Sequence, residues 1–321
     1  MPFLVSIIIP AYNAGDFIQD TIESALRQTY YPIEIVVIDD GSQDDTINIA
    51  LNYKEKVKVI CQKNYGPAAA RNKGIQESQG DFIAFLDADD IWTQDKIQSQ
   101  VNILENNLDI GLLCSDMIDF EGSKIDQLSH FKKNKLNQEY FQHKLLVKDA
   151  FRKIFYRNFV STPTVLMRKA LVNKIGFFPE EFRYAEDYLY WLRAARHAHI
   201  GYQSSIFVYR RRHRFNLTND PGFQVKHRVA ILDRIVLEHG DILYEHGIDI
   251  EKRYAELWFQ LGYFELFQNK NPQVSSAFAN SLRHRLHWRT VFYLFVSMLG
   301  FGQVMIRLKE FRDSVMKKYF K

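Results

Sequence analysis

Cysteine is scarce in this sequence. Cys61 and Cys114 are the only two cysteines among 321 residues, and they do not form a C-x-x-C pair. Proteins that depend on a disulfide framework carry more cysteines at closer spacing, and they fold in oxidising compartments. The cysteine content therefore excludes a disulfide scaffold and favours a protein of the reducing cytoplasm.

Long apolar runs are missing as well. The uncharged stretch 290–306 has 17 residues and contains glycine, whereas a membrane-spanning helix needs about 20 predominantly apolar residues. The opening residues MPFLVSIIIPAYN lack the basic segment and the small-residue cleavage site of a signal peptide, so we interpret them as a strand. We expect a cytoplasmic protein, with the inner face of the cell membrane as an alternative location.

Glycine is absent where a dinucleotide-binding fold would need it. The segment after the first predicted strand reads PAYNAG, at residues 10–15. A nicotinamide-dependent oxidoreductase needs G-x-G-x-x-G there, because glycine lets the backbone approach the pyrophosphate. The sequence therefore argues against this class of enzyme.

Positive charge is concentrated at the C-terminal end. The whole chain has a formal net charge of +4, yet residues 283–321 alone contain nine Lys and Arg against two Asp and Glu. The apolar stretch 291–306 inside this region allows two interpretations. It is either a buried helix of a C-terminal bundle or a segment in the membrane interface, whose basic flanks are attracted to anionic lipid.

The first third of the chain alternates between strand and helix patterns. Four short apolar runs rich in β-branched residues predict buried strands at residues 4–9, 33–38, 57–61 and 81–86. A segment with helical spacing of apolar residues follows each of them. This alternation predicts an α/β fold with a mostly parallel sheet that is flanked by helices.

The remaining sequence is less regular. Strand character returns at 110–115 and 159–168, a loop is expected at 124–148, a helix begins at Glu186, and from about residue 224 the pattern is helical. We therefore divide the chain into three parts. These are residues 1–105, residues 106–223 and a helical C-terminal region at 224–321, for which peripheral membrane contact is one interpretation.

Carboxylates gather where the fourth predicted strand ends. Residues 85–90 read FLDADD, which places Asp87, Asp89 and Asp90 within four positions. Like charges at this spacing repel each other unless a cation neutralises them, and aspartate oxygens suit Mg²⁺ or Mn²⁺. The alternative is a solvated turn in which Asp89 or Asp90 caps the next helix.

Five segments together resemble the inverting glycosyltransferases of family 2, which have the GT-A fold, a Rossmann-like arrangement. The resemblance is strong over residues 4–105 and weaker over 159–215, and it does not reach the C-terminal hundred residues. The segments are VSIIIPAYNAGDFIQDTIESALRQTY, EIVVIDDGSQDDT, NYGPAAARNKGI, GDFIAFLDADDIW and AEDYLYWLRA.

The resemblance implies that residues 1–105 form a nucleotide-sugar-binding half and residues 106–223 an acceptor-binding half. It also implies how the nucleotide-sugar donor is bound. Either Asp39 or Asp40 would hydrogen-bond the base or the ribose, and Arg71 would approach the donor. The residues that would line the base pocket are Pro10, Ala11, Tyr12 and Asn13.

The resemblance also implies the catalytic groups. Asp87 and Asp89 match the DxD motif, in which Asp89 would bind Mn²⁺ or Mg²⁺ and Asp87 would lie near the ribose or a metal-bound water. His213, in the basic run YRRRHR, is an additional candidate ligand. Asp187 would be the general base that deprotonates an acceptor hydroxyl, because a metal-stabilised diphosphate leaves without a protein acid.

We therefore expect an inverting transfer of a sugar, most commonly from a UDP donor, to a glycan, a lipid-linked molecule or another hydroxyl acceptor. The alternative is a nucleotide-sugar-binding protein of the same fold without turnover. The hypothesis that the protein binds nucleic acid depends only on the basic run at residues 209–214, so we expect no nucleic-acid partner.

Overall fold

The computed structural model describes residues 2–214, 221–267 and 274–299. The chain divides into two compact units, Met1–Asn216 and Leu217–Lys321, which are described separately below. The first unit contains all the candidate donor-binding, metal-binding and catalytic residues. The assignment of 1–105 and 106–223 to donor and acceptor binding stays a prediction.

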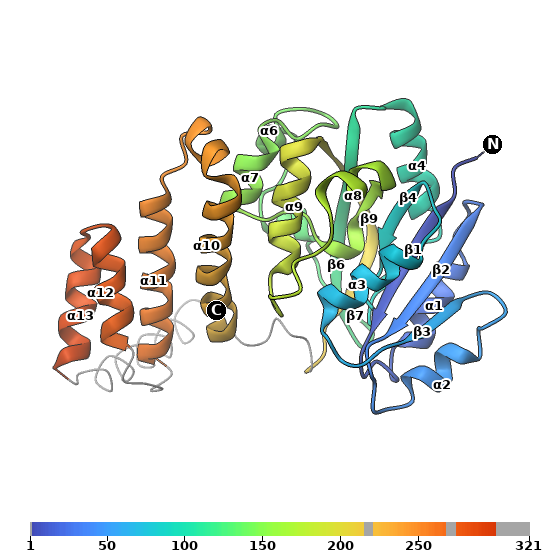
Figure 1. The fold of residues 1–321 in the computed structure, drawn as a ribbon, viewed down its shortest axis with the longest axis horizontal. Coiled ribbons are helices and arrows are strands. Elements are labelled where there is room, and N and C mark those ends of the chain that lie inside the picture. The colour runs from blue at the N-terminus through green and yellow to red at the C-terminus, as the bar shows by residue number, and fades with distance from the viewer. Residues whose placement is uncertain (1, 215–220, 268–273, 300–321) are drawn as a thin grey trace. The chain divides into compact units, whose positions relative to one another are not determined.

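The predicted parallel strands are present in the first unit (Figure 1). They pair in the order β3-β2-β1-β4, and all three pairings are parallel. Most residues of β1, β2 and β4 are buried, as expected for strands covered on both faces, whereas no residue of the edge strand β3 is fully buried. The strands are β1 (Val5–Ala11), β2 (Ile33–Asp39), β3 (Lys58–Cys61) and β4 (Phe82–Phe85).

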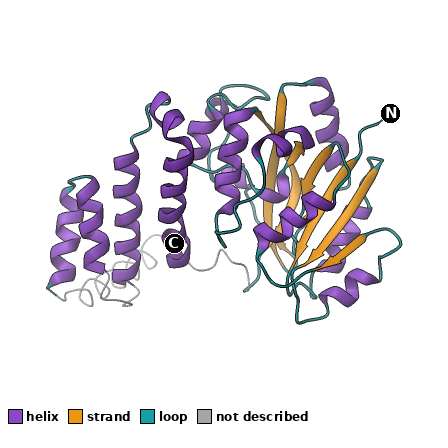
Figure 2. Ribbon diagram, viewed as in Figure 1, coloured by secondary structure: helices purple, strands orange, loops and turns teal. Residues whose placement is uncertain are grey.

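Helices cover both faces of this sheet (Figure 2). Ile18 and Ile22 of α1 belong to one core cluster, with Ile35 and Val37 of β2. Ala70 of α3 packs instead with neighbouring residues of β2 that point to the opposite face. The helices after the four strands are α1 (Ile18–Leu26), α2 (Thr46–Leu51), α3 (Pro67–Glu77) and α4 (Lys96–Asn106).

The sheet becomes mixed beyond β4. There β8 is antiparallel to β4 and β6, whereas β6 and β9 are parallel to each other. The fold class predicted from sequence is therefore confirmed, and the parallel pairings are concentrated in its N-terminal half. The additional strands are β5 (Ile91–Trp92), β6 (Ile110–Glu121), β7 (Lys124–Ile125), β8 (Leu166–Arg168) and β9 (His199–Arg211).

Two local predictions were wrong. The strand expected at 159–168 is reduced to β8, because residues Thr162–Thr164 form a 3₁₀ turn in which Pro163 has no N–H to donate to a sheet. The loop expected at 124–148 contains β7 and two short helices, α5 (His130–Lys133) and α6 (Gln138–Phe141). Ser129 and Asn137 cap these helices by accepting backbone hydrogen bonds.

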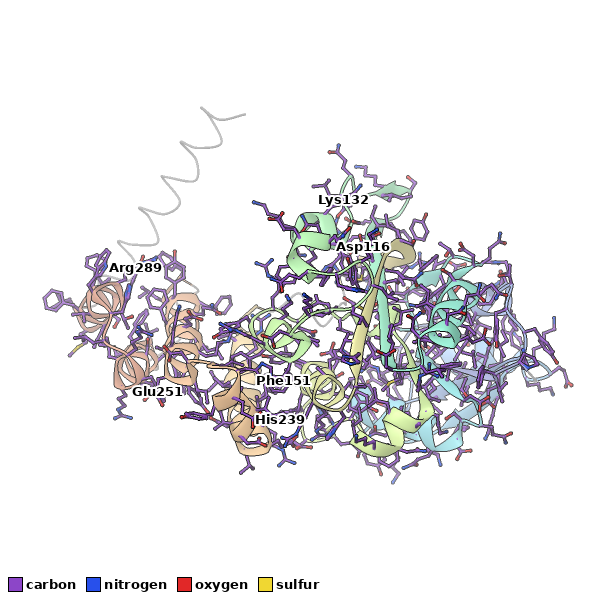
Figure 3. All side chains as sticks on the ribbon, turned by 90° about the horizontal axis from the view of Figure 1, so that it is seen from above. Asp116, Lys132, Phe151, His239, Glu251 and Arg289 are labelled. Carbon is purple, nitrogen blue, oxygen red and sulfur yellow. The ribbon has the colours of Figure 1, made fainter. Side chains whose placement is uncertain are left out.

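The segment that contains α5 is anchored to the sheet by a buried carboxylate. Asp116 of β6 lies beside α5, the helix that carries Lys132 (Figure 3). Its Oδ1 accepts a hydrogen bond from the Phe131 backbone N–H at 2.8 Å. The remaining helices of this unit are α7 (Ala150–Tyr156), α8 (Lys169–Ile175) and α9 (Glu186–His197).

The second unit is helical in its described residues, as predicted. Its core includes Leu261 of α11 and Phe278 of α12. Among the helices that the structure describes, none combines the length and the apolar character needed to cross a bilayer. The helices are α10 (Pro221–Glu245), α11 (Ile250–Phe267), α12 (Val274–His284) and α13 (Trp288–Met298).

The contact between α3 and β1 gives a test of the packing. A Cβ at Gly74 would lie 2.3 Å from Ile8 Cγ2, so Gly74→Ala should destabilise the protein by about 1–3 kcal/mol. Gly240→Ala in α10 is the matched control, because a Cβ there meets nothing within 4 Å. Urea unfolding of the two variants checks this, and equal stabilities would contradict the close approach.

Candidate active site

Three polar segments meet at one edge of the sheet. They follow β1, β2 and β4, which are neighbouring parallel strands. The first begins at Tyr12, the second ends β2 at Asp39 and the third begins at Asp87. The convergence expected from parallel topology is therefore present, and this edge is the candidate active site.

The segment after β1 is tied to the segment after β2. Asn13 has a left-handed backbone, with φ of 48°. Its Oδ1 accepts a hydrogen bond from Gln43 N at 2.8 Å, and its own N–H donates to Ser42 Oγ at 3.0 Å. Tyr12 is 50% exposed beside this loop. The exposed ring of Tyr12 therefore lies next to a loop that hydrogen bonds hold in place.

Pro10 and Ala11 form the floor beside this loop. In the parallel register Pro10 is opposite Ile38 and Ala11 is opposite Asp39. The Asp40 N–H also donates to the Ala11 carbonyl at 2.8 Å. The ends of β1 and β2 are thus fixed side by side.

Asp39 and Asp40 are both buried but differ in their partners. Asp40 Oδ1 accepts hydrogen bonds from Gln62 Nε2 and Tyr65 N, and its Oδ2 accepts one from Gly66 N. Asp39 Oδ2 accepts one from Ser42 N, whereas its buried Oδ1 has no partner among the described residues. Asp40 therefore holds the loop before α3, and Asp39 retains an oxygen for a ligand.

Hydrogen bonds from α1 fix the DADD turn, residues 87–90. Thr21 Oγ1 lies 2.9 Å from the carbonyl oxygens of Ala88 and Asp90. Asp90 is buried, and its Oδ1 accepts a hydrogen bond from the Arg211 N–H at 3.0 Å. Burial and the charges of Asp89 and Asp87 raise the pKa of Asp90 well above its usual range. Asp90 thus belongs to the structure of the turn, which presents Asp87 and Asp89 outward.

Arg71 joins the turn to α9. Its Nη2 donates to Asp87 Oδ1 at 2.9 Å, and its Nη1 donates to Glu186 Oε1 at 2.6 Å. Arg71 is 7% exposed. Burial would lower the pKa of Arg71, but the charges of Asp87 and Glu186 raise it, so the guanidinium stays protonated. The buried cation therefore fixes two carboxylates from distant parts of the sequence.

Asp89 is paired with His213. His213 Nε2 lies 2.9 Å from Asp89 Oδ2, and the imidazole stacks on Phe17 with ring centroids 4.5 Å apart. Burial and the neighbouring charge of Asp87 raise the pKa of Asp89. The fold thus brings His213, the additional candidate ligand, to Asp89, and its role as a metal ligand stays a prediction.

Asp187 occupies the start of α9. Ala185 precedes the helix with a left-handed backbone, φ of 58°, and the helix begins with Glu186 and Asp187. Asp187 Oδ2 accepts a hydrogen bond from Thr162 Oγ1 at 3.3 Å. Burial and the charge of Glu186 raise the pKa of Asp187 to about 7, against the opposing effect of Arg71. A carboxyl with this pKa can accept a proton near neutral pH.

The segment that carries Thr162 is fixed by a brace of hydrogen bonds from residues 92–100, which follow the DADD turn. Three consecutive carbonyls, those of residues 163–165, accept hydrogen bonds from side chains that follow the acidic turn. Trp92 Nε1 and Gln100 Nε2 each donate at 2.9 Å, and Lys96 Nζ lies 3.5 Å from the third carbonyl. Lys96 is fully buried, and burial lowers its pKa well below the usual range.

The basic run does not present a free cationic patch in the described residues. Arg210 pairs with Asp119 and Arg212 with Asp126, at 2.8 and 3.0 Å. Arg211 pairs with Asp20 at 2.9 Å and also donates to the Asp89 carbonyl. Arg211 therefore supports the acidic turn, whereas Arg210 and Arg212 pair with carboxylates of β6 and of the segment after β7.

The donor set is compatible with Mn²⁺ or Mg²⁺. Within the described residues, no three His, Cys, Asp or Glu side chains are grouped so that they could hold a metal by themselves. These ions keep waters and use substrate phosphates, so one or two carboxylates are sufficient protein ligands. Burial and the neighbouring charge of Asp87 raise the pKa of Asp89, so a bound cation would stabilise the ionised form of this carboxyl.

Sequence reasoning missed three contributors to this site. Glu186 binds Arg71, Thr162 binds Asp187 and Phe17 supports His213. The contact between Arg71 and Glu186 joins residues 115 positions apart. A sequence signal existed only for Glu186, which lies beside Asp187 in the AEDYLYWLRA segment. Thr162 and Phe17 belong to no recognisable motif.

Comparison with known proteins identifies the family. Residues 6–176 match the family described as Glycosyl transferase family 2. The chain belongs to glycosyltransferase family 2. An uncharacterized glycosyltransferase of Rickettsia prowazekii is 36% identical over 219 residues, which are 67% of this chain and 66% of that protein.

A second relative of this chain carries the name of a specific glycosyltransferase activity. The UDP-Glc:alpha-D-GlcNAc-diphosphoundecaprenol beta-1,3-glucosyltransferase WfaP of Escherichia coli is 50% identical over 105 residues, 32% of this chain and 41% of that protein. The chain thus spans less than two thirds of the length of both relatives.

Solved structures show the same fold. S. aureus TarS 1-349 in complex with UDP-GlcNAc aligns with a TM-score of 0.63 and 21% identity, over 95% of this chain and 88% of that one. The mannosyltransferase PcManGT from Pyrobaculum calidifontis, in complex with GDP-Man and Mn²⁺, aligns with a TM-score of 0.57 and 14% identity, over 100% and 88%. The predictions of the family, of the GT-A-type fold and of a glycosyltransferase are confirmed.

The pKa of Asp187 gives a prediction that is independent of activity. Because the folded-state pKa lies above the unfolded value of about 3.9, this group favours folding below about pH 4, and that contribution is lost as the pH rises through 7. Asp187→Asn should therefore raise the melting temperature relative to the parent more at pH 8 than at pH 5.

Melting curves at the two pH values check this, with Asp109→Asn as control because the Asp109 side chain is 63% exposed. A difference between Asp187→Asn and the parent that does not change with pH would contradict the raised pKa.

Proposed function

We propose that this protein transfers a sugar from a UDP-linked donor to an acceptor hydroxyl with inversion at the anomeric carbon. The observation that carries the proposal is the position of Asp187. It is a carboxyl with a pKa of about 7, connected through Glu186 and Arg71 to the DxD turn. The UDP-Glc in the name of WfaP and the UDP-GlcNAc in the TarS complex support the choice of donor.

The nucleoside end of the donor would bind between the ends of β1 and β2. The Asp39 Oδ1 that lacks a described partner would accept a hydrogen bond from the base or the ribose. The exposed Tyr12 ring would stack on the base, over the floor formed by Pro10 and Ala11. Asn13 would position the loop after β2 through its hydrogen bonds to Ser42 and Gln43. Asp40 would act only by positioning the loop at residues 62–66.

The diphosphate end would lie against the DADD turn. Asp89 and His213 would hold a divalent cation, and Asp87 would bind the ribose or a metal-bound water. When bound, this cation stabilises the negative charge of the departing diphosphate as a Lewis acid. Arg71 would reach the donor through Asp87, because its guanidinium is buried between two carboxylates.

Asp187 would act as the general base. Its carboxylate takes the proton of the acceptor hydroxyl while that oxygen attacks the anomeric carbon from the face opposite the diphosphate. The new bond forms as the bond to the diphosphate breaks, so the configuration inverts. Thr162 orients the carboxylate and stabilises its charged form.

The acceptor class follows from chemistry and from one relative. The WfaP name contains a diphosphoundecaprenol acceptor, so a lipid-linked glycan at the inner face of the cell membrane is the acceptor that we propose. The second candidate is a nucleotide-sugar-binding protein without turnover. The acidic edge argues against it, because binding alone does not need a carboxyl poised near pH 7.

Asp187→Asn tests the assignment of the base. This variant should bind UDP and Mn²⁺ with unchanged affinity but lose at least about a thousandfold in the rate of UDP release, since no other group is placed to take the proton. Calorimetry and a UDP-release assay with UDP-Glc and UDP-GlcNAc measure the two effects. Parent-like turnover in this variant would reject the base, and loss of UDP binding would move Asp187 to the donor site.

Asp89→Ala tests the metal-binding role. The Mn²⁺-dependent part of UDP affinity should fall by about tenfold or more, because the cation loses a carboxylate ligand. Uridine, which has no phosphate, is the matched control and should bind the variant and the parent equally. An unchanged Mn²⁺ titration of UDP binding would contradict the assignment.

A further inference from the structure

The last described helix, α13, has two apolar faces. One face packs inside the second unit, where Tyr293 contacts the rings of Phe259, Tyr263 and Phe278. The other face is exposed and is called the outer stripe below. Its residues are Trp288, Val291, Phe292, Phe295, Met298 and Leu299, all at least 45% exposed.

The outer stripe is continuous along the helix. With 3.6 residues per turn, its six residues fall within an arc of about 120°. Three of them are aromatic, and Leu286 just before the helix is 80% exposed as well. Soluble proteins rarely leave an apolar patch of this kind without an interaction partner. The outer stripe therefore needs an occupant.

The charged side chains of α12, α13 and the segment between them have one sign. Residues 274–299 contain three arginines, two histidines and no Asp or Glu. Arg285 pairs with Asp249. Arg283 donates to Asn280, and Arg289, labelled in Figure 3, lies over the Phe259 ring, without an ion pair to any described residue. A partner that complements this surface thus offers an apolar region to the outer stripe and negative charge to the arginines beside it.

We propose that α13 docks on an anionic lipid surface through the outer stripe. The stripe would enter the boundary between headgroups and acyl chains, with Trp288 at the headgroup level and the arginines near lipid phosphates. The helix would lie in the interface, since its 11 described residues are fewer than the roughly 20 that a crossing needs. This inference rests on residues 274–299 and does not depend on the proposed catalytic residues.

A second copy of the chain fits this surface less well. An isologous contact would place the same face on both sides of the interface. It would then bring the arginines of one copy close to those of the other, with no acid between residues 274 and 299 to neutralise them.

Vesicle sedimentation of the full-length protein tests the proposal. The protein should bind vesicles of equal parts phosphatidylglycerol and phosphatidylcholine, bind pure phosphatidylcholine far more weakly, and dissociate as the salt concentration rises. The variant Phe292→Ser/Phe295→Ser/Met298→Ser should bind at least about tenfold more weakly, because it removes apolar area that enters the lipid.

The matched control is Leu237→Ser/Tyr244→Ser in α10. These side chains are 76% and 87% exposed and lie in the same unit but outside the stripe, so this variant should bind like the parent. Melting curves confirm that both variants fold. Brominated phosphatidylglycerol should quench part of the tryptophan emission, and Trp288→Tyr should remove that quenching.

Three results would overturn the proposal. They are a parent protein that does not bind anionic vesicles or binds neutral ones equally well, a triple variant that binds like the parent, and tryptophan quenching that survives in Trp288→Tyr. Light scattering that shows a dimer in the parent and a monomer in the triple variant would assign the outer stripe to a second copy.

Discussion

The buried guanidinium of Arg71 is the interaction on which the candidate active site depends. A buried cation is tolerated only when carboxylates neutralise it and satisfy its hydrogen bonds. Asp87 and Glu186 do so from the turn after β4 and from the start of α9. The same ion pairs therefore fix the distance between the DxD turn and the helix that carries Asp187. Without the cation, two carboxylates would repel each other across the site.

Much of the first unit could be predicted because its determinants are local. The buried strands and amphipathic helices up to residue 105 follow from short patterns of apolar residues. Parallel topology then forces the ends of β1, β2 and β4 to one edge, so the polar segments at Tyr12, Asp39 and Asp87 had to converge. Sequence could not choose between Asp39 and Asp40, because that difference lies in the partners on the loop at residues 62–66.

The rest could not be predicted because it depends on contacts between distant residues. Thr162 reads as one polar residue of a strand-like run, and only the fold brings it to Asp187. The uncharged stretch near 291–306 allowed a buried or a membrane-facing helix. The described part has one face of each kind, whereas residues 300–306 lie outside the described residues.

The brace between Trp92, Lys96, Gln100 and the carbonyls of residues 163–165 constrains how this site can change over time. Its three donors lie four residues apart, from the end of β5 into α4, and its three acceptors are consecutive, so a deletion between the donors or between the acceptors would shift the bonds out of register. Insertions in the segment 126–148 would leave these bonds untouched. Changes in chain length at 126–148 therefore do not reach this brace, whereas changes at 92–100 or 163–165 would disrupt it beside the DxD turn and Asp187.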